Sequence, residues 1–276
     1  MSEAANEAGA RVLVHGAGGR MGRAVVALLS SDERMRLAAA VDARSAAALG
    51  RDAGELAGAA TLGVVITADL TAALLGSDVV IDFSTAGAVP ALARAAAAGR
   101  TPTIICTTGL DAEALAAIDG LARVAPVVIA SNTSAGVTVL LHLAARAAEL
   151  LGDDYDIEIV EMHHRHKVDA PSGTALRLAE AVAGARGLEL ANAARHGRSG
   201  QVGARTRDEI GILALRGGDV IGEHTVLFAG AGERIELTHR AHSRDLFARG
   251  ALRAARWVVS QPAGKYEMAD VLGIPR

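Results

Sequence analysis

The first half of the chain alternates short apolar runs with alanine-rich stretches of helical composition. The apolar runs are residues 11–15, 37–41, 79–82, 103–105 and 127–129, and helices are expected at residues 20–30, 89–98 and 111–123. Strands that are apolar on both faces are typical of a parallel sheet that helices cover on both sides. The pattern therefore predicts an α/β fold with a doubly wound parallel sheet. Residues 43–75 are less regular and offer only a possible strand at residues 64–67.

The pattern changes after about residue 151. Strand-like segments then follow one another at residues 155–162, 210–216, 220–228 and 234–238, with one helix expected at residues 174–185. Ile235 and Leu237 alternate with polar residues, as in a strand with one solvated face. This predicts a second, α+β domain with a mixed or antiparallel sheet. We expect residues 1–133 to form the first domain and residues 134–242 the second, with residues 243–276 packing back on the first.

Charge and cysteine content exclude several classes of protein. The chain carries 28 basic and 31 acidic residues, whereas a nucleic-acid-binding protein usually has a strong basic excess. Its single cysteine, Cys106, excludes an intramolecular disulfide framework and a multi-cysteine zinc site.

No run of 18 apolar residues is free of charges and glycine breaks, so no membrane span is expected. Residues 1–10 lack an apolar signal core and are expected to form a frayed tail. We expect a cytoplasmic protein.

A glycine-rich turn follows the first apolar run directly. The segment Gly16-Ala17-Gly18-Gly19-Arg20-Met21-Gly22 opens a predicted helix. Glycines allow a tight turn and a close approach to a pyrophosphate, and the positive end of the helix attracts that anion. Asp42 ends the second apolar run, where a carboxylate can bind ribose hydroxyls. Met21 stands where the strict pattern has glycine, but strand, turn, helix and acid together predict a Rossmann-like dinucleotide site. Asp42 favours NAD over NADP, and the nearby Arg20 and Arg44 offset that preference.

Three of the nine histidines lie in the segment Glu161-Met162-His163-His164-Arg165-His166-Lys167, just after a predicted strand. Arg165 and Lys167 would repel a metal cation, so no metal is expected there. A solvated basic loop is one interpretation. The other is an anion pocket, since histidine and lysine can deliver a proton as hydride arrives. The segment Pro171-Ser172-Gly173-Thr174 then opens a helix whose N–H groups suit a carboxylate. We therefore expect an acidic substrate.

Taken together, these segments resemble the 4-hydroxy-tetrahydrodipicolinate reductase (dihydrodipicolinate reductase) family. The resemblance covers essentially everything after the N-terminal tail. It depends on the glycine-rich turn, on Thr107-Thr108-Gly109, on Asn132-Thr133-Ser134-Ala135-Gly136-Val137 and above all on residues 161–174, with residues 222–225 and 266–272 in support. It implies an NAD(P)H-dependent reduction of 4-hydroxy-tetrahydrodipicolinate, via dihydrodipicolinate, to tetrahydrodipicolinate in lysine and diaminopimelate biosynthesis.

The resemblance also implies roles for single residues. His163 would be the catalytic histidine and Lys167 the proton donor. His164 would bind the substrate, and Gly173 and Thr174 its carboxylate. NADH or NADPH would contact a set of residues at the ends of the first-domain strands: Gly16, Ala17, Gly18, Gly19, Arg20, Met21, Asp42, Cys106, Thr107, Thr108, Ala130, Ser131, Asn132 and Thr133. Family members are typically homotetramers that associate through the second-domain sheet, so a homotetramer is expected.

Two positions depart from the family pattern. Cys106 stands where the family usually has glycine, and Thr133 where it usually has phenylalanine. Both lie at strand ends that we expect to face the nicotinamide. Cys106 also leaves open a second hypothesis, an enzyme like the semialdehyde dehydrogenases in which the cysteine is the nucleophile. A third hypothesis, from a different class, is a nucleotide sensor without chemistry, although a sensor has no need of proton donors.

Overall fold

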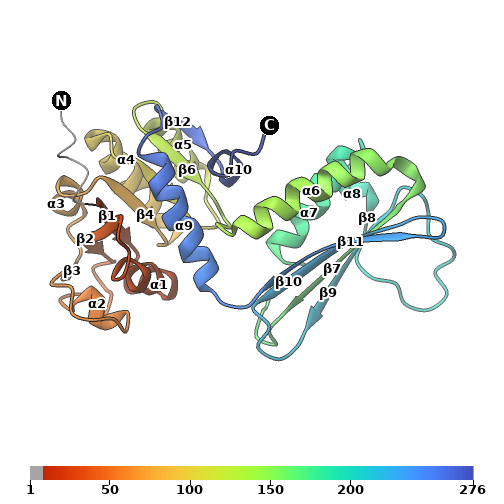
Figure 1. Ribbon diagram of the computed structural model, residues 1–276, viewed down its shortest axis with the longest axis horizontal. Helices are drawn as coiled ribbons and strands as arrows, with labels where there is room; N and C mark the ends of the chain where they lie inside the picture. The colour runs from red at the N-terminus through yellow and green to blue at the C-terminus, as the bar shows by residue number, and fades with distance from the viewer. Residues whose placement is uncertain (1–8, 276) are drawn as a thin grey trace. The chain divides into compact units, whose positions relative to one another are not determined.

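The computed structural model describes residues 9–275 and forms two compact units (Figure 1). One unit comprises Met1–Ser134 together with Asp245–Arg276, and the other comprises Ala135–Arg244. A frayed tail was expected at residues 1–10, and residues 1–8 of it lie outside the described residues. Ala10 belongs to the first strand. The two units are described separately below.

The first unit is built on a parallel sheet, as the apolar runs predict. Its seven strands lie in the order β12-β6-β5-β4-β1-β2-β3, and every neighbouring pair is parallel. The strands are β1 (Ala10–His15), β2 (Met35–Val41), β3 (Ile66–Thr67), β4 (Val79–Asp82), β5 (Thr103–Ile105), β6 (Pro126–Ile129) and β12 (Gly264–Tyr266). The strand order reverses at β1, between β4 and β2, which is where ligands bind in sheets of this kind.

Helices cover both faces of this sheet, so the doubly wound architecture is confirmed. They are α1 (Arg20–Leu29), α2 (Ala53–Leu56), α3 (Leu70–Leu75), α4 (Val89–Gly99), α5 (Ala112–Ala122), α9 (Asp245–Val258) and α10 (Met268–Val271). Successive residues of β1 point to opposite faces. Val12 and Val14 join a core with α1 and α9, whereas Leu13 joins a second core with α4 and α5.

Residues near the C-terminus complete the first unit. Helix α9 lies beside α1, and β12 adds a seventh strand next to β6. The sequence analysis did not predict β12, because Gly264–Tyr266 is short and contains glycine and lysine, which strands disfavour. Its place is set by pairing with β6 and by Tyr266, whose ring packs edge-on against Trp257.

The second unit has a mixed sheet in the order β11-β10-β7-β9-β8. Its strands are β7 (Asp156–His163), β8 (Ala194–Arg195), β9 (Ile210–Arg216), β10 (Gly222–Ala229) and β11 (Arg234–Ala241). The β7–β10 and β10–β11 pairs are antiparallel, whereas β7–β9 and β8–β9 are parallel. Helices α6 (Ala135–Leu151), α7 (Gly173–Ala185) and α8 (Leu190–Ala193) accompany the sheet. Figure 1 shows α6 and α7 on one side of it.

Helix α6 continues into a stretch, Ala135–Asp154, that is long and apolar enough to cross a membrane by length and composition. That criterion alone is weak evidence, because the core helix of a soluble protein meets it too. Leu140, Ala144 and Ala148 of this helix are buried in the core that β7 and α7 form. The helix therefore packs as a core element of the second unit.

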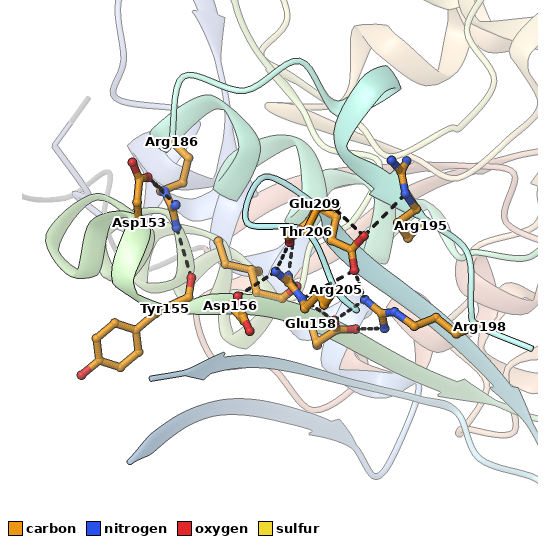
Figure 2. A network of polar contacts seen from close by, with 11 residues as sticks. Asp153, Tyr155, Asp156, Glu158, Arg186, Arg195, Arg198, Arg205, Thr206 and Glu209 are labelled. Carbon is orange, nitrogen blue, oxygen red and sulfur yellow. Dashed lines mark hydrogen bonds and ion pairs between the residues drawn. The ribbon is translucent and has the colours of Figure 1, made fainter. Parts of the chain in front are cut away.

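The long segment between β8 and β9 is held by ion pairs on the face of the sheet away from α7. Arg198 pairs with Glu158 at 2.9 Å and with Glu209 at 2.5 Å, and Arg205 pairs with Glu158 at 3.1 Å and with Asp156 at 2.8 Å (Figure 2). Glu158 lies over Gly211 of β9, where an added Cβ would overlap its carboxylate. Glycine at 211 therefore makes room for the carboxylate that ties this segment down.

The contact between α9 and the chain after β6 gives a stability prediction. An added Cβ at Gly250 would overlap the carbonyl oxygen of Thr133, whose hydroxyl donates to the carbonyl oxygen of Phe247 at 2.6 Å. We expect Gly250→Ala to lower the free energy of unfolding by about 1–3 kcal/mol, because backbone must move. Gly120→Ala in α5 is the matched control, since its Cβ meets only the end of Arg123 at 3.6 Å. Urea unfolding measures both, and equal stability of the two variants would contradict the prediction.

Candidate active site

The glycine-rich turn has the shape that a phosphate-binding loop needs. Gly16 has a φ of +78°, and an added Cβ there would lie 2.6 Å from the carbonyl oxygen of Phe83. A Cβ at Gly22 would overlap the carbonyl oxygen of Gly16, so α1 starts against the turn itself. The helix has Gly19 at its N-cap, no side-chain cap and no acidic residue in its first turn. Its positive end is therefore available to an anion, which fits a pyrophosphate.

Asp42 is already bonded to this turn. One carboxylate oxygen accepts the N–H of Gly18 at 2.6 Å and the other accepts the N–H of Ala43 at 2.7 Å. A Cβ at Gly18 would lie 2.8 Å from the Asp42 Oδ2 atom and 2.6 Å from the Cβ of Ala48. The carboxylate thus holds the turn in place, and each oxygen keeps a lone pair with which it can accept a ribose hydroxyl.

A buried aspartate that the sequence analysis did not single out joins three strand ends. Asp82 ends β4 and is fully buried. Its carboxylate contacts the Nδ1 atom of His15 at 2.8 Å, and it accepts the hydroxyl of Thr107 at 2.6 Å and the N–H of Ser84 at 3.2 Å. His15 therefore packs at the end of β1, as a structural histidine would. The hydrogen bond to Asp82 fixes the orientation of the Thr107 side chain.

The two departures from the family pattern are both buried. Burial raises the pKa of the Cys106 thiol well above its ordinary value, and the negative charge of Asp82 adds to this effect. The thiol is therefore held in its unreactive form. The Thr133 side chain is directed to α9, where it bonds the carbonyl oxygen of Phe247. Thr133 thus contributes to the packing of α9, and the expectation that both side chains face a nicotinamide stays a prediction.

The remaining predicted cofactor residues lie at the same edge of the sheet. Thr108 is exposed after β5. Ala130 is buried after β6, and its N–H donates to the carbonyl oxygen of Ile105 at 2.9 Å. Ser131 is exposed, and the side-chain oxygen of Asn132 accepts the N–H of Ser134 at 2.9 Å. Because all the strands are parallel, their carboxyl ends bring these residues to the edge where the glycine-rich turn lies.

In the second unit, the predicted catalytic histidine is the last of the inward-facing residues of β7. Ile157, Ile159, Glu161 and His163 alternate along the strand and point to the face that α7 covers. His163 is mostly buried, and its Nδ1 atom lies 2.5 Å from the Oε2 atom of Glu161. The other ring nitrogen, Nε2, lies beside Gly222, where an added Cβ would come within 3.0 Å of it.

Glu161 is fully buried and nevertheless ionised. Burial acts to raise the pKa of Glu161, but the hydrogen bonds from Arg216 and His163 outweigh it and lower the pKa below its ordinary value. Arg216 binds the carboxylate in a bidentate way, at 2.9 and 3.0 Å. The N–H of Ser172 donates to Glu161 at 3.1 Å. The sequence analysis predicted neither the contact of Arg216 with Glu161 nor that of Ser172.

The predicted proton donor Lys167 lies in the loop after β7. Its ammonium group contacts both carboxylate oxygens of Asp169 at 2.8 Å. The loop is tied to the β9–β10 hairpin, because the N–H of Gly217 donates to the carbonyl oxygen of His163 and the N–H of Arg165 to that of Gly218. His164 has a lowered pKa, since it is partly desolvated and surrounded by cations, of which Arg244 has the largest effect.

Helix α7 begins at the same place. Gly173 and Thr174 form its first turn, and the Ser172 hydroxyl oxygen caps the helix by accepting the N–H of Ala175 at 3.2 Å. The Ser172 Oγ atom also lies 3.0 Å from the Nε2 atom of His224. The structure therefore brings His163, Lys167, Gly173 and Thr174 to one end of the second unit.

His224, on β10, is the histidine that the sequence analysis left unplaced. It is buried, and its ring packs edge-on to that of His163 at 5.2 Å between centroids. Burial, reinforced by repulsion from His163, lowers the pKa of His224 to about 4. Among the described residues, its Nδ1 atom is one of three buried side-chain polar atoms without a hydrogen-bond partner. The imidazole that packs against His163 is therefore neutral at physiological pH.

Within residues 9–275, no group of three or more His, Cys, Asp or Glu side chains is arranged to hold a metal ion. The histidines of this site are held by other contacts: His163 by Glu161 and His224 by Ser172. Arg216 and Lys167 place positive charge beside them. The site can accept anions and move protons.

Comparison with known proteins links both units to one family. Residues 10–133 match the family described as dihydrodipicolinate reductase, N-terminus, and residues 136–272 match dihydrodipicolinate reductase, C-terminus. A 4-hydroxy-tetrahydrodipicolinate reductase from Anaeromyxobacter dehalogenans is 50% identical over 264 residues, which cover 96% of this chain and 98% of the relative. One from Halorhodospira halophila is 51% identical, with 94% and 97% covered.

Solved structures agree with this result. A dipicolinate-bound dihydrodipicolinate reductase from Paenisporosarcina sp. TG-14 has a TM-score of 0.77 at 26% identity and covers 95% of this chain and 98% of its own. An amine dehydrogenase from Mycobacterium smegmatis has a TM-score of 0.61 at 14% identity, over 98% of this chain and 97% of its own, and shares the fold alone.

The depressed pKa of His224 gives a pH prediction. An unfolded histidine takes up a proton near pH 6.5, whereas folded His224 resists protonation down to about pH 4. The unfolded state therefore binds more protons in this window, and acid favours it. We expect this residue to contribute a loss of about 3 kcal/mol in unfolding free energy between pH 6.5 and 4. Urea unfolding at both pH values should show a smaller loss in His224→Asn, and an unchanged loss would contradict the assignment.

Proposed function

The chain belongs to the dihydrodipicolinate reductase family, and on that premise we propose that its first unit binds NADH or NADPH while the second binds the substrate and supplies protons. The reaction is the reduction of 4-hydroxy-tetrahydrodipicolinate, via dihydrodipicolinate, to tetrahydrodipicolinate, with the 4-hydroxyl lost as water. It belongs to lysine and diaminopimelate biosynthesis, which we place in the cytoplasm. The observation that carries the proposal is the convergence of His163, Lys167 and the start of α7 in one place.

The backbone conformation of the glycine-rich turn, as well as its sequence, suits the binding of a dinucleotide by the first unit. Gly16 adopts a φ that side chains disfavour, and a Cβ at Gly18 or Gly22 would meet neighbouring atoms. The uncapped N-terminus of α1 would hold the pyrophosphate, and Asp42 the ribose. When bound, NADH or NADPH supplies the hydride. Thr107 is held by Asp82 at the adjacent strand end, where it can orient the nucleotide.

The second unit fits a small cyclic dicarboxylate. One carboxylate of the substrate would bind at the first turn of α7, formed by Gly173 and Thr174, where the helix dipole is positive. His164 and Lys167 add donors from the loop after β7. The Paenisporosarcina protein binds dipicolinate, a planar dicarboxylate, which supports a site of this charge and size.

The proton that completes the reduction comes from His163 or Lys167. The Nδ1 atom of His163 is engaged by Glu161, so Nε2 is the nitrogen that can exchange a proton with the substrate. Two of the three ammonium hydrogens of Lys167 can be occupied by Asp169, and the third remains for the substrate. After transfer, either group regains its proton from water.

The comparisons lend no support to the two alternative hypotheses. The two family models together span residues 10–272, and both curated relatives reported above, each matched over more than nine-tenths of the chain, are named as reductases of this kind. Cys106 is buried with a raised pKa, which is the opposite of what a nucleophilic cysteine requires. The semialdehyde dehydrogenase hypothesis therefore has no support from Cys106, and a non-catalytic sensor would leave His163 and Lys167 unexplained.

Substitution of the proton donors tests the function. We expect His163→Gln and Lys167→Met each to lower kcat by about 10²–10⁴-fold, because each removes a proton-transfer group. The assay follows NADH or NADPH oxidation with substrate generated by condensing pyruvate with aspartate semialdehyde. Because the nucleotide residues lie in the other unit, the Kd for NADH should stay within about 2-fold of wild type. Wild-type protein that does not oxidise the nucleotide in response to this substrate would refute the function, and full activity in both variants would refute the residue roles.

We further propose that the protein is a homotetramer that associates through the open face of the second sheet. Alternating residues of β7 and β9 on that face are apolar, namely Val160, Met162, Leu213 and Leu215, and none of them is buried within one chain. Leu215 is 48% exposed. Within the described residues, α6 and α7 lie on the other face, so a second copy is the partner that this apolar face suits (Figure 1).

Analytical ultracentrifugation tests the assembly. We expect wild-type protein to sediment as a tetramer and Leu215→Glu to sediment as smaller species, because a buried unpaired carboxylate would oppose association. Leu150→Glu is the matched control, since Leu150 is 68% exposed on α6, away from the sheet face, and should leave the tetramer intact. A monomeric wild type, or a tetrameric Leu215→Glu, would contradict this mode of assembly.

A further inference from the structure

Glu161 is an acidic residue in a row of core positions. On β7 it follows Ile157 and Ile159 on the face that packs against α7, and it is as fully buried as they are. A buried ionised carboxylate is unfavourable unless hydrogen bonds and an opposite charge compensate it. An apolar residue would continue the core at no such cost, so packing does not explain a glutamate here.

Both oxygens of this carboxylate are fully engaged. Oε2 contacts the Nδ1 atom of His163 at 2.5 Å and accepts from Arg216 at 2.9 Å. Oε1 accepts from Arg216 at 3.0 Å and from the N–H of Ser172 at 3.1 Å. An ionised carboxylate can only accept hydrogen bonds, so the Nδ1 atom of His163 must carry a hydrogen. The reactive nitrogen of His163 is then Nε2.

The same contacts reach the other parts of the site. Arg216, besides holding Glu161, donates to the carbonyl oxygen of Asp169 at 2.6 Å, and the carboxylate of Asp169 holds Lys167. Ser172, whose N–H binds Glu161, caps the helix that Gly173 begins. One buried side chain therefore connects the histidine, the lysine loop and the start of α7.

We propose that Glu161, held by Arg216, is the positioning residue of this site: it fixes the His163 imidazole as the Nδ1–H form and aligns it with the first turn of α7. This inference rests on the proposed function. In the protonation step the Nε2–H bond of the His163 imidazolium breaks and a bond from that hydrogen to the substrate forms. The neutral imidazole keeps its hydrogen on Nδ1, bonded to Glu161. Glu161 itself stays ionised and gives up no proton.

The test is a double-mutant cycle on kcat with Glu161→Gln, His163→Gln and the combined variant. Glutamine keeps the shape but loses the charge, and its NH2 group replaces one acceptor oxygen, so it cannot accept all four of the hydrogen bonds that the carboxylate accepts. We expect Glu161→Gln to lower kcat by about 10²-fold. Because Glu161 acts through His163, the double variant should be within about 2-fold of His163→Gln. The Kd for NADH, whose residues lie in the other unit, should not change, and the far-UV circular dichroism spectrum reports on folding of the whole chain.

Glu158→Gln is the matched control. Glu158 lies on the same strand and is also paired with arginines, Arg198 and Arg205 (Figure 2). It points to the opposite face of the sheet, because it is three positions from Glu161 along the strand. Its loss removes a comparable ion pair without touching His163, so kcat should stay within about 2-fold of wild type. An equal fall of kcat in both variants would show that ion pairs on this strand act only through general stability, and would overturn the proposal.

A second readout does not depend on activity. Long-range ¹H–¹⁵N correlation spectra report which imidazole nitrogen carries the hydrogen, and comparison with His163→Gln identifies the signals of His163. We expect a hydrogen on Nδ1 in wild type and a mixture of the two neutral forms in Glu161→Gln. A bare Nδ1 in wild type overturns the proposal whether or not the protein reduces the expected substrate.

The outcomes separate this inference from the proposed function. Inactive wild-type protein with a hydrogen on Nδ1 refutes the function and leaves the positioning contact standing. Active wild type with full kcat in Glu161→Gln refutes the positioning role alone. If Glu161→Gln does not fold, Arg216→Lys replaces it, because lysine keeps the charge but loses the bidentate contact and the bond to Asp169. Its kcat should fall at least 10-fold, and an unchanged kcat overturns the proposal.

Discussion

An ionised carboxylate cannot be buried in a protein core without partners that match its charge and its hydrogen-bonding capacity. Glu161 meets this constraint through Arg216, His163 and Ser172, and each partner comes from a different element: the end of β9, the end of β7 and the start of α7. Because all three must converge on one group, the ends of these elements have little freedom. The geometry of the site in the second unit follows from this.

The first unit uses the same principle at the edge of its parallel sheet. Asp82 is fully buried and joins His15 and Thr107, so the ends of β1, β4 and β5 are linked by side chains as well as by the sheet. Asp42 links the end of β2 to the glycine-rich turn. In both units a carboxylate at a strand end organises the loops that would bind ligands. Those loops therefore have a defined shape before any ligand arrives.

Much of the fold was predictable because its signals are local. The apolar runs of the first half are strands since both of their faces are covered, and the glycine-rich turn needs glycine for backbone reasons at Gly16 and Gly22. Strand β12 was not predictable, since it has only three residues, two of them glycine and lysine, which strands disfavour, and it forms by pairing with β6. The contact of Thr133 with α9 was not predictable either, since it joins residues more than a hundred positions apart.

The sequence by itself determined the two-part architecture and the family, and it singled out His163, Lys167, Gly173 and Thr174 as candidate site residues, because periodicity and short motifs are properties of neighbouring residues. Only the tertiary structure showed that Glu161 contacts both Arg216 and His163, that buried Asp82 holds Thr107, and that Cys106 is buried with a raised pKa. Partners, burial and pKa depend on which residues, distant in sequence, come to surround a group. No local pattern of amino acids carries that information.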